Sequence, residues 1–392
     1  MKRIAVIGAG AAGCFCAAEL RRRRPAVKVY VYESGPKPLA KVAITGGGRC
    51  NLTNSFEGIR SLGEAYPRGE RLMKRLLRVF SQEDTWRWFE DAGVPLVLQD
   101  DHCVFPRSQD AMDIVHALLR RMEGVNLLLR TPVHSIGPDL TVDGEAYDAV
   151  VVTTGGAPKG LPLLEGLDLE WVPTAPSLFT FTIQDEGLRA LMGLVVEATV
   201  SIPGTTFKAD GPLLITDWGL SGPAVLKLSS YAARHLHDAG YKAPLSVNWL
   251  SLSEAETRAL LEELSTANPR KQVSNTPPAG LQARLWNYLT VKAGLRLDIR
   301  WAELGSKGLN KLVNTLAQDS YTIAGKTKFR DEFVTCGGVA LSNLNPATLE
   351  SKQYPGLYFA GEVLDIDAIT GGFNLQAAWT TGYVAAQSIA SK

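Results

Sequence analysis

The feature that most constrains this chain is the pattern G-x-G-x-x-G at residues 8–13, close to the N-terminus. It follows a short apolar run at 4–7 and opens a segment of helical character, 11–24. Valines then alternate along a second apolar segment that ends at Glu33. A strand, a glycine turn, a helix and a second strand form a β-α-β unit. The chain is therefore expected to fold around a Rossmann-type parallel sheet.

Each part of this unit has a physical role in binding a dinucleotide. Gly8 permits the tight turn, Gly10 lets a pyrophosphate approach the backbone, and Gly13, after Ala12, lets the helix pack on the sheet. The free N–H groups at the helix start stabilise a diphosphate. Glu33 follows Gly13 by 20 residues (33 − 13) and accepts the hydroxyl hydrogens of an adenosine ribose. Its charge disfavours NADP, but the pattern does not separate FAD from NAD.

Four longer segments resemble one known family. They are KVAITGGGRCNLTN at 41–54, LLITDWGLSGPAVL at 213–226, TCGGVAL at 335–341 and GLYFAGEVLDIDAITGGFNLQAAW at 356–379. In this order they resemble the bacterial three-domain flavoproteins that include BaiN-like reductases and aminoacetone oxidase. The likeness covers nearly the whole chain, and it implies an FAD-dependent oxidoreductase acting on a small organic substrate. Within the family, reduction of an unsaturated or keto steroid-like substrate and oxidation of an amine both stay open.

The resemblance also implies an α/β fold built from three domains. A Rossmann-type FAD-binding domain would comprise residues 1–172 and 334–392. A mainly β, barrel-like domain, 173–249 and 320–333, is inserted into it, and a helical domain, 250–319, is inserted into that one. The sequence changes character at similar places, because β-type stretches follow residue 175 and a capping box, Ser253 with Glu256, opens a helix-rich stretch.

Local signals place further elements. Ser81 with Asp84 is another capping box, and Ser108 is expected to cap a helix that runs to about Met122. Residues 133–136 are expected to form a strand, 41–54 a glycine-rich loop, and the last helix begins near Asn374.

By resemblance, a set of residues beyond the first β-α-β unit lies along the FAD. Glu362 is placed for ribityl or phosphate-side hydroxyls, and glycines at 371–372 open a helix aimed at the flavin N1–C2=O edge, where it stabilises negative charge. Thr154-Gly155-Gly156 resembles a second flavoprotein fingerprint, with Thr153 in place of the usual alanine. The full set is Lys41, Gly47, Gly48, Arg49, Cys50, Asn51, Val133, Thr154, Gly155, Gly156, Gly361, Glu362, Gly372, Phe373, Asn374 and Gln376.

Two of these residues have open alternatives. Arg49 neutralises the diphosphate or binds the flavin edge, or else it forms a surface ion pair. Val133 gives backbone hydrogen bonds to adenine, or else it only packs in the core.

Cys50 lies roughly where flavin disulfide reductases carry a redox pair. Such a pair needs a second cysteine five residues on, but that position is Ser55. Cys50 is therefore interpreted as a small loop residue near the flavin. The five cysteines are scattered and odd in number, which favours a reduced, cytoplasmic protein. The five histidines do not cluster, so no metal site is expected, and no catalytic acid–base pair is visible.

The charge balance, 41 Lys+Arg against 40 Asp+Glu, gives a net charge of +1. A near-neutral chain lacks the broad footprint of a nucleic-acid or membrane-surface binder, so neither partner is expected. Two alternatives stay open: an FAD-dependent RNA-modifying protein and a non-catalytic nucleotide-binding regulator. No second G-x-G-x-x-G occurs, so NAD(P)H, where it is used, is expected to bind only transiently.

Overall fold

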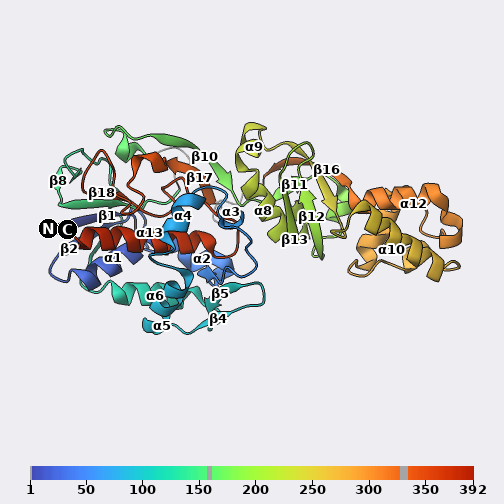
Figure 1. Ribbon diagram of the computed structural model, residues 1–392, viewed down its shortest axis with the longest axis horizontal. Helices are drawn as coiled ribbons and strands as arrows, with labels where there is room; N and C mark the ends of the chain where they lie inside the picture. Colours follow the sequence, from blue (N-terminus) through green and yellow to red (C-terminus); the bar gives the residue numbers. More distant parts are fainter. Residues whose placement is uncertain (1, 157–160, 327–333) are drawn as a thin grey trace. The chain divides into compact units, whose positions relative to one another are not determined.

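The computed structural model describes residues 2–156, 161–326 and 334–392 (Figure 1). The chain forms two compact units, one of Met1–Ser177 with Asp331–Lys392 and the other of Leu178–Arg330. The first unit therefore draws on both ends of the chain. The exact boundaries of three domains stay a prediction, because the barrel and the helices that follow it fall in one unit.

A five-stranded parallel sheet forms the centre of the first unit. Its strands are short, apolar and mostly buried, as expected for strands covered on both faces. In the register, Ile7 lies opposite Tyr32 and Val152, so three strands end at the same edge. Gly8, Glu33 and Thr153 follow directly at that edge. The order is β18 (Leu357–Phe359), β9 (Ala149–Val152), β1 (Arg3–Ile7), β2 (Lys28–Tyr32) and β6 (Asn126–Leu128).

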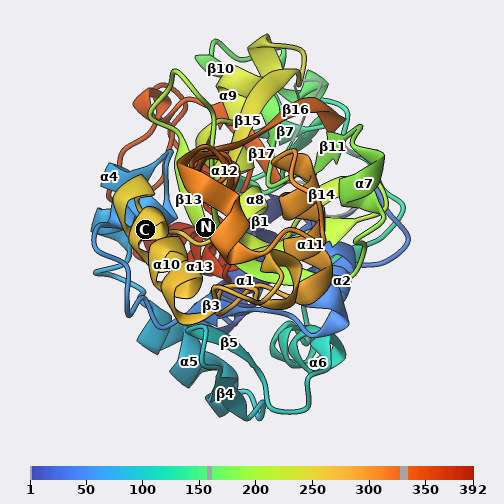
Figure 2. The same ribbon diagram turned by 90° about the vertical axis from the view of Figure 1, so that its right-hand side faces the viewer.

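Two long helices, α1 (Ala11–Arg23) and α13 (Phe373–Ala390), lie side by side in both views (Figures 1 and 2). A Cβ on Gly382 would lie 2.7 Å from the Ala12 carbonyl oxygen, so the two backbones meet at a glycine. Phe15 of α1 packs against Trp379 of α13, with their ring centroids 5.5 Å apart. This packing joins residues from opposite ends of the chain into one core.

The other elements of the first unit lie between these landmarks. They are α2 (Ala40–Gly48), β3 (Thr53–Asn54), α3 (Leu62–Ala65), α4 (Glu70–Leu76), α5 (Gln82–Asp91), β4 (Leu96–Leu98), β5 (Cys103–Pro106), α6 (Ala111–Arg121), β7 (Thr141–Val142), β8 (Glu145–Ala146), η1 (Pro162–Leu164), β10 (Trp171–Ser177), β17 (Val334–Val339) and η3 (Leu341–Asn343).

Three local expectations need correction. Residues 41–54 are not all loop, because α2 begins at Ala40 and is broken only at Thr45–Gly47, where the dihedral angles leave the helical range. The cap of α6 is Asp110, which accepts from Met112 N at 2.8 Å, and not Ser108. The expected strand at 133–136 is absent, apart from one bridge at Ile136. The capping box of Ser81 with Asp84 is confirmed at the start of α5.

The second unit holds a closed antiparallel barrel and three longer helices. The order of the barrel strands is β11 (Phe181–Ile183), β14 (Gly219–Ser221), β13 (Lys208–Thr216), β12 (Val195–Ser201), β15 (Ala243–Asn248) and β16 (Asp319–Lys326). Between β15 and β16 the chain forms α10 (Glu254–Ala267), η2 (Val273–Asn275), α11 (Ala283–Lys292) and α12 (Trp301–Ala317), and the capping box of Ser253 with Glu256 opens α10. Shorter helices are α7 (Glu186–Arg189), α8 (Pro223–Tyr231) and α9 (Ala233–Asp238). The expected fold class is therefore confirmed.

No helix in the described part of the chain is long and apolar enough to cross a membrane.

Candidate cofactor-binding site

The glycine turn after β1 has the geometry that a bound diphosphate needs. Gly8 has φ +108°, and a Cβ there would lie 2.5 Å from Thr153 O. A Cβ on Gly13 would lie 1.9 Å from Gly8 O, so neither position accepts a larger residue. Gly10 differs, because a Cβ there would meet no atom within 4 Å. Since α1 also begins without a side-chain cap, its first N–H groups face open space and are available to phosphate oxygens.

Glu33 and Val133 lie together at the expected adenosine end. The Glu33 carboxylate accepts from Ala9 N at 2.9 Å and from Gly35 N at 2.6 Å. These bonds orient the carboxylate, and Oε2, which accepts only from Ala9 N among the described residues, keeps a further lone pair for a ribose hydroxyl. Thr131 N donates to Glu33 O at 2.8 Å, which brings the following residues alongside. Val133 lies in a loop, and its backbone N–H and C=O have no hydrogen-bond partner among the described residues.

The start of α13 is held by a second close-packed glycine. Gly372 has φ +89°, and a Cβ there would lie 2.3 Å from Thr53 O. The Asn51 amide accepts from Gly372 N at 3.3 Å and donates to Thr53 O at 2.9 Å. The helix has no side-chain cap, so its free N–H groups and dipole favour negative charge in front of it.

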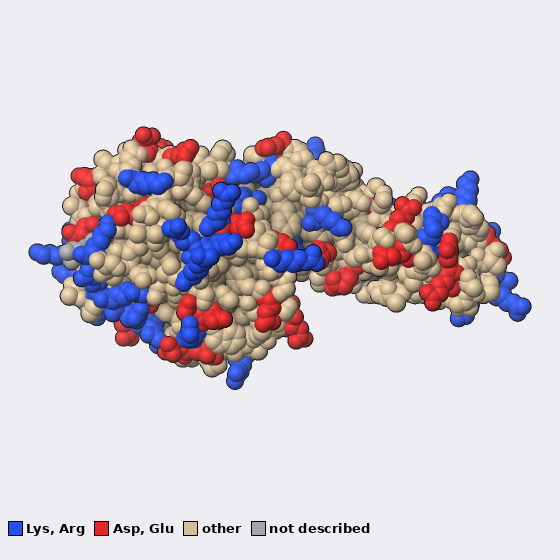
Figure 3. All heavy atoms as spheres, viewed as in Figure 1, with Lys and Arg blue, Asp and Glu red and all other residues tan. Residues whose placement is uncertain are grey.

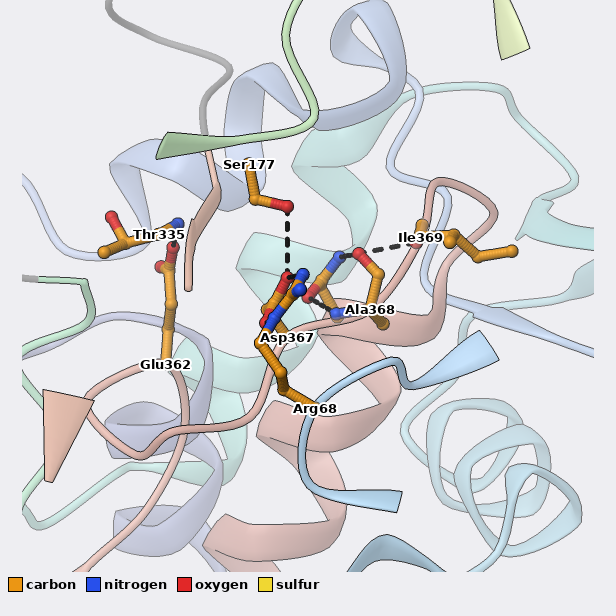
Figure 4. A network of polar contacts seen from close by, with 8 residues as sticks. Arg68, Ser177, Thr335, Glu362, Asp367, Ala368 and Ile369 are labelled. Atoms are coloured by element: carbon orange, nitrogen blue, oxygen red, sulfur yellow. Dashed lines mark hydrogen bonds and ion pairs between the residues drawn. The ribbon is translucent and has the colours of Figure 1, made fainter. Parts of the chain in front are cut away.

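A polar clamp fixes the loop that leads into α13 (Figure 4). The Asn374 side chain accepts from Ala368 N and donates to Ala368 O, both at 2.9 Å. Next to it, the buried Asp367 carboxylate pairs with Arg68 through two hydrogen bonds and accepts from Ser177 Oγ at 3.0 Å. Burial lowers the pKa of Arg68, but the hydrogen bonds and charge of Asp367 outweigh it, and the pKa lies above the usual value. The loop therefore has one well-defined conformation.

Glu362 brings three separate sequence motifs together. Its carboxylate accepts from Thr335 N at 2.9 Å, as Figure 4 shows, and lies 3.4 Å from Lys41 Nζ. A Cβ on Gly156 would lie 2.4 Å from Thr335 Oγ1, and one on Gly155 would lie 3.7 Å from Glu362. Glycine is thus required at 156 by the close approach of β17, and it is favoured at 155 by the left-handed φ of +77°.

Thr154 carries the observation that most directly fits a ligand. Its hydroxyl is buried and has no hydrogen-bond partner in the described part of the chain, which is costly for a polar group unless a ligand satisfies it. Thr153, the departure from the family pattern, bonds instead to Ile7 O at 3.0 Å and Gly8 O at 2.9 Å. Gly361 closes the same region, since a Cβ there would lie 2.7 Å from the Ala12 Cβ. Together with the two uncapped helix starts, these residues fit FAD.

Arg49 and Cys50 have contacts of their own. The Arg49 guanidinium lies 4.5 Å from the Phe105 ring centroid and donates to Gly46 O at 3.2 Å. Its contact with FAD stays a prediction, as do the contacts of the neighbouring Gly47 and Gly48, where a Cβ would meet nothing within 4 Å. Cys50 is fully buried, and this burial raises the pKa of its thiol to about 12. A thiol in this state is not a nucleophile at neutral pH.

Phe373 and Gln376 are expected site residues that lie behind the helix start. Both are buried, and the Gln376 side chain bridges the Thr53 hydroxyl at 2.5 Å and the Thr380 hydroxyl at 2.9 Å. Phe373 O accepts from the Tyr66 hydroxyl at 2.9 Å. Their side chains support the position of α13.

Sequence reasoning did not identify Arg68, Ser177, Asp367 or Thr335. Asp367 lies in a motif that the sequence analysis recognised, and an acidic residue in a largely apolar segment could have indicated a buried, paired carboxylate. Arg68 and Ser177 lie in no motif, and only the fold reveals their partnership.

Comparisons with known proteins find relatives over nearly the whole chain. The family described as "HI0933-like protein Rossmann domain" matches residues 2–388. The chain is 31% identical to a ribosomal RNA dihydrouridine synthase of Escherichia coli, over 98% of this chain and 97% of that protein. It is 29% identical to the protein of the same name in Haemophilus influenzae, over 98% and 97%. A 3-dehydro-bile acid delta(4,6)-reductase of Clostridium scindens is 27% identical over the full length of both chains.

Proposed function

The chain belongs to the HI0933-like family and is an FAD-dependent oxidoreductase, and we propose that it reduces a carbon–carbon double bond conjugated to a carbonyl group. The observation that carries this proposal is that full-length relatives with different substrates are named for the same kind of chemistry.

That common chemistry follows from the two names. Dihydrouridine is uridine with hydrogen added across C5=C6, a double bond conjugated to the C4 carbonyl. A 3-dehydro-bile acid with a Δ4 double bond carries the same conjugated unit in a steroid ring. In both cases a hydride adds at the carbon β to the carbonyl and a proton adds at the α carbon. A family of sites that serves both substrates needs a hydride donor and an opening through which the double bond reaches it. The two substrates need not share an overall shape.

For this chain we propose a uracil base in ribosomal RNA as the substrate. Two relatives with that named activity are 31% and 29% identical, against 27% for the bile-acid reductase. The expectation of no nucleic-acid partner rested on the net charge alone, and a near-zero net charge does not exclude a local basic surface. A soluble ring with a conjugated carbonyl, as in the bile-acid reductase, is the second candidate.

The residues of the first unit would hold FAD in one orientation. The start of α1 would bind the diphosphate, Glu33 the ribose and Val133 the adenine, while the free N–H groups at the start of α13 would stabilise negative charge on the flavin. FAD bound there supplies the hydride for the double bond. The uncapped start of α13 stabilises negative charge, and the clamp of Asn374 and the Arg68–Asp367 pair keeps this start in position. NAD(P)H would act as a transient reductant at the exposed side of the cofactor.

Ribosomal RNA transcribed in vitro tests the proposal, because all of its uridines are unmodified. The FAD-loaded protein is incubated anaerobically with this RNA and with NADH or NADPH, and the digested nucleosides are analysed by mass spectrometry. The expected result is a nucleoside two hydrogen atoms heavier than uridine. A 3-oxo-Δ4 steroid is assayed in parallel. Reduction of the steroid alone selects the second candidate, and reduction of neither overturns the proposed chemistry.

A further inference from the structure

The short helix α4 presents an exposed row of basic side chains that no cofactor contact explains. Arg71, Lys74 and Arg75 of α4 follow the i, i+3, i+4 spacing of one helix face, and Arg78 lies in the turn just after the helix; all four are exposed. The opposite face, Leu72, Met73 and Leu76, is buried. Figure 3 shows Lys and Arg side chains gathered where Figure 1 labels α4. We call these four residues the α4 basic face.

The charges of the α4 basic face are not neutralised inside the protein. None of the four side chains makes an ion pair or hydrogen bond with another described residue. Glu70 is the only acid between residues 69 and 80. Four unpaired charges of one sign on a seven-residue helix and the turn after it repel one another, so an arrangement of this kind is typical of a surface that meets an anionic partner.

The other dense basic run, Arg21 to Arg24, provides the contrast. Arg22 and Arg23 both bind the buried Glu19, at 2.7 and 3.1 Å. Arg21 donates to two backbone carbonyls, and Arg24 to Ala390 O. This run stabilises helix ends and the contact with the C-terminus, and therefore leaves little free charge.

The α4 basic face is also tied rigidly to the loop in front of the expected flavin. Arg68, just before α4, forms the buried ion pair with Asp367. A Cβ on Gly69, which has φ +83°, would lie 2.7 Å from Ile366, so the turn into α4 rests directly on the same loop. That loop continues to Gly372 at the start of α13. A ligand held by α4 is thus held at a fixed distance from the cofactor site, within one unit of the chain.

We propose that the α4 basic face binds the phosphate backbone of an RNA substrate and delivers a base to the flavin. This inference rests on the proposed RNA substrate, and it assigns the contact surface that the relatives' names do not specify. A small neutral substrate would have no use for such a face. An RNA needs one, because phosphate contacts set its affinity and register while the active site reads the base.

The test compares two double variants with the same loss of charge and the same spacing. Arg71→Ala/Arg75→Ala removes half of the α4 basic face. The control, Lys307→Ala/Lys311→Ala, removes two exposed lysines from α12 in the other unit. FAD content and melting temperature establish that both variants fold. Binding of a fluorescein-labelled single-stranded RNA of mixed sequence is followed by anisotropy over a range of salt concentrations.

We expect the α4 variant to bind RNA at least about tenfold more weakly at low salt, with the slope of log K against log salt reduced by roughly 0.7 for each phosphate that the variant no longer binds. Its KM for transcribed ribosomal RNA rises in parallel, whereas the control variant matches wild type. Equal binding by the α4 variant and wild type overturns the inference and leaves the proposed reaction standing. RNA binding through α4 without dihydrouridine formation contradicts the proposed reaction but not the RNA-binding surface. A wild-type protein that binds anionic lipid vesicles but no RNA overturns both the RNA-binding surface and the proposed RNA substrate.

Discussion

At the scale of single residues, Gly10 is the position where a small change should separate folding from cofactor binding. Its φ of −83° is open to any residue, and an added Cβ would meet no protein atom within 4 Å. Gly10→Val should therefore fold normally while its methyl groups occupy the place of the diphosphate. The measurement is the flavin absorbance of the purified variant. Gly325→Val is the control, because that position is equally open but lies in β16 of the other unit. A full flavin spectrum in Gly10→Val would show that the site is misplaced.

Thr154 gives a second residue-scale prediction, with two readouts of opposite sign. Thr154→Val keeps the shape and removes a buried hydroxyl that has no partner in the described protein. The apo-protein should be as stable as wild type or more stable, by up to about 1 kcal/mol, because the desolvation cost disappears. FAD affinity should fall roughly three- to tenfold, the worth of one hydrogen bond. Thr257→Val removes a comparable orphaned hydroxyl from α10 and should leave FAD affinity unchanged. Equal FAD affinity in both variants would contradict a role for Thr154.

The cysteines allow a test of the buried-thiol interpretation. All five are free and buried, and burial raises the pKa of Cys50 to about 12 and that of Cys103 to about 11. The thiolate fraction at pH 8 is then negligible, so iodoacetamide should label none of them in the folded protein. Mass spectrometry should find five adducts only after unfolding. Rapid labelling of Cys50 in the native protein would restore the interpretation of Cys50 as a catalytic thiol.

Residues differ in how far the sequence alone could assign them. The positions of Gly8, Gly13 and Glu33 at the turn after β1 and at the end of β2 were predictable, because they depend on backbone geometry within one short β-α-β unit. Arg68 and Asp367 were not, since they lie 299 residues apart and meet only after the sheet is assembled. The orphaned hydroxyl of Thr154 was equally invisible, because burial without a partner is a property of the folded surroundings.

At the scale of elements, the start of α13 should depend on the clamp of Asn374. Asn374→Ala leaves Ala368 N–H and C=O without their partners, which should cost about 1–3 kcal/mol and loosen the loop that faces the flavin. Ser253→Ala, at the cap of α10, should cost a similar amount, about 1 kcal/mol. Thermal unfolding should show both losses, but only Asn374→Ala should weaken FAD retention. If both variants retain FAD equally, the loop does not hold the cofactor.

Elements followed the sequence where the signal was local. The capping boxes at Ser81 and Ser253 work through side chains three residues apart, and both helices begin where they predict. Ser108 and Asp110 are both residue types that cap helices, and they lie two residues apart before α6. The Asp110 carboxylate accepts from Met112 N, so Asp110 is the cap. Residues 133–136 have strand composition, but no neighbouring strand is available to pair with them beyond one bridge. Pairing is a tertiary property, which a single segment does not encode.

At the scale of the whole molecule, the net charge gave no sign of the α4 basic face. A net charge of +1 describes the sum over 392 residues, whereas binding depends on the local field. The same sum contains the neutralised run at Arg21–Arg24 and the unpaired charges of α4. The sequence also could not reveal the strand order, because β18, from the C-terminal end, pairs with β9 more than 200 residues earlier.

The whole molecule also determines how electrons reach the cofactor. The second unit is an antiparallel barrel with helices, and no strand-turn-helix unit for a second dinucleotide occurs among its described residues. A nicotinamide cofactor must then approach the flavin from the side that the substrate also uses. Stopped-flow reduction by NADH and NADPH should show weak binding, with a rate that rises nearly linearly with concentration, and RNA should inhibit it competitively. Glu33 should confer no preference for NADH or NADPH in this experiment, because it is assigned to the proposed FAD site. Tight, saturable nicotinamide binding that RNA does not affect would reveal a dedicated site elsewhere in the chain. Flavin reduction by neither nucleotide would indicate a different electron donor.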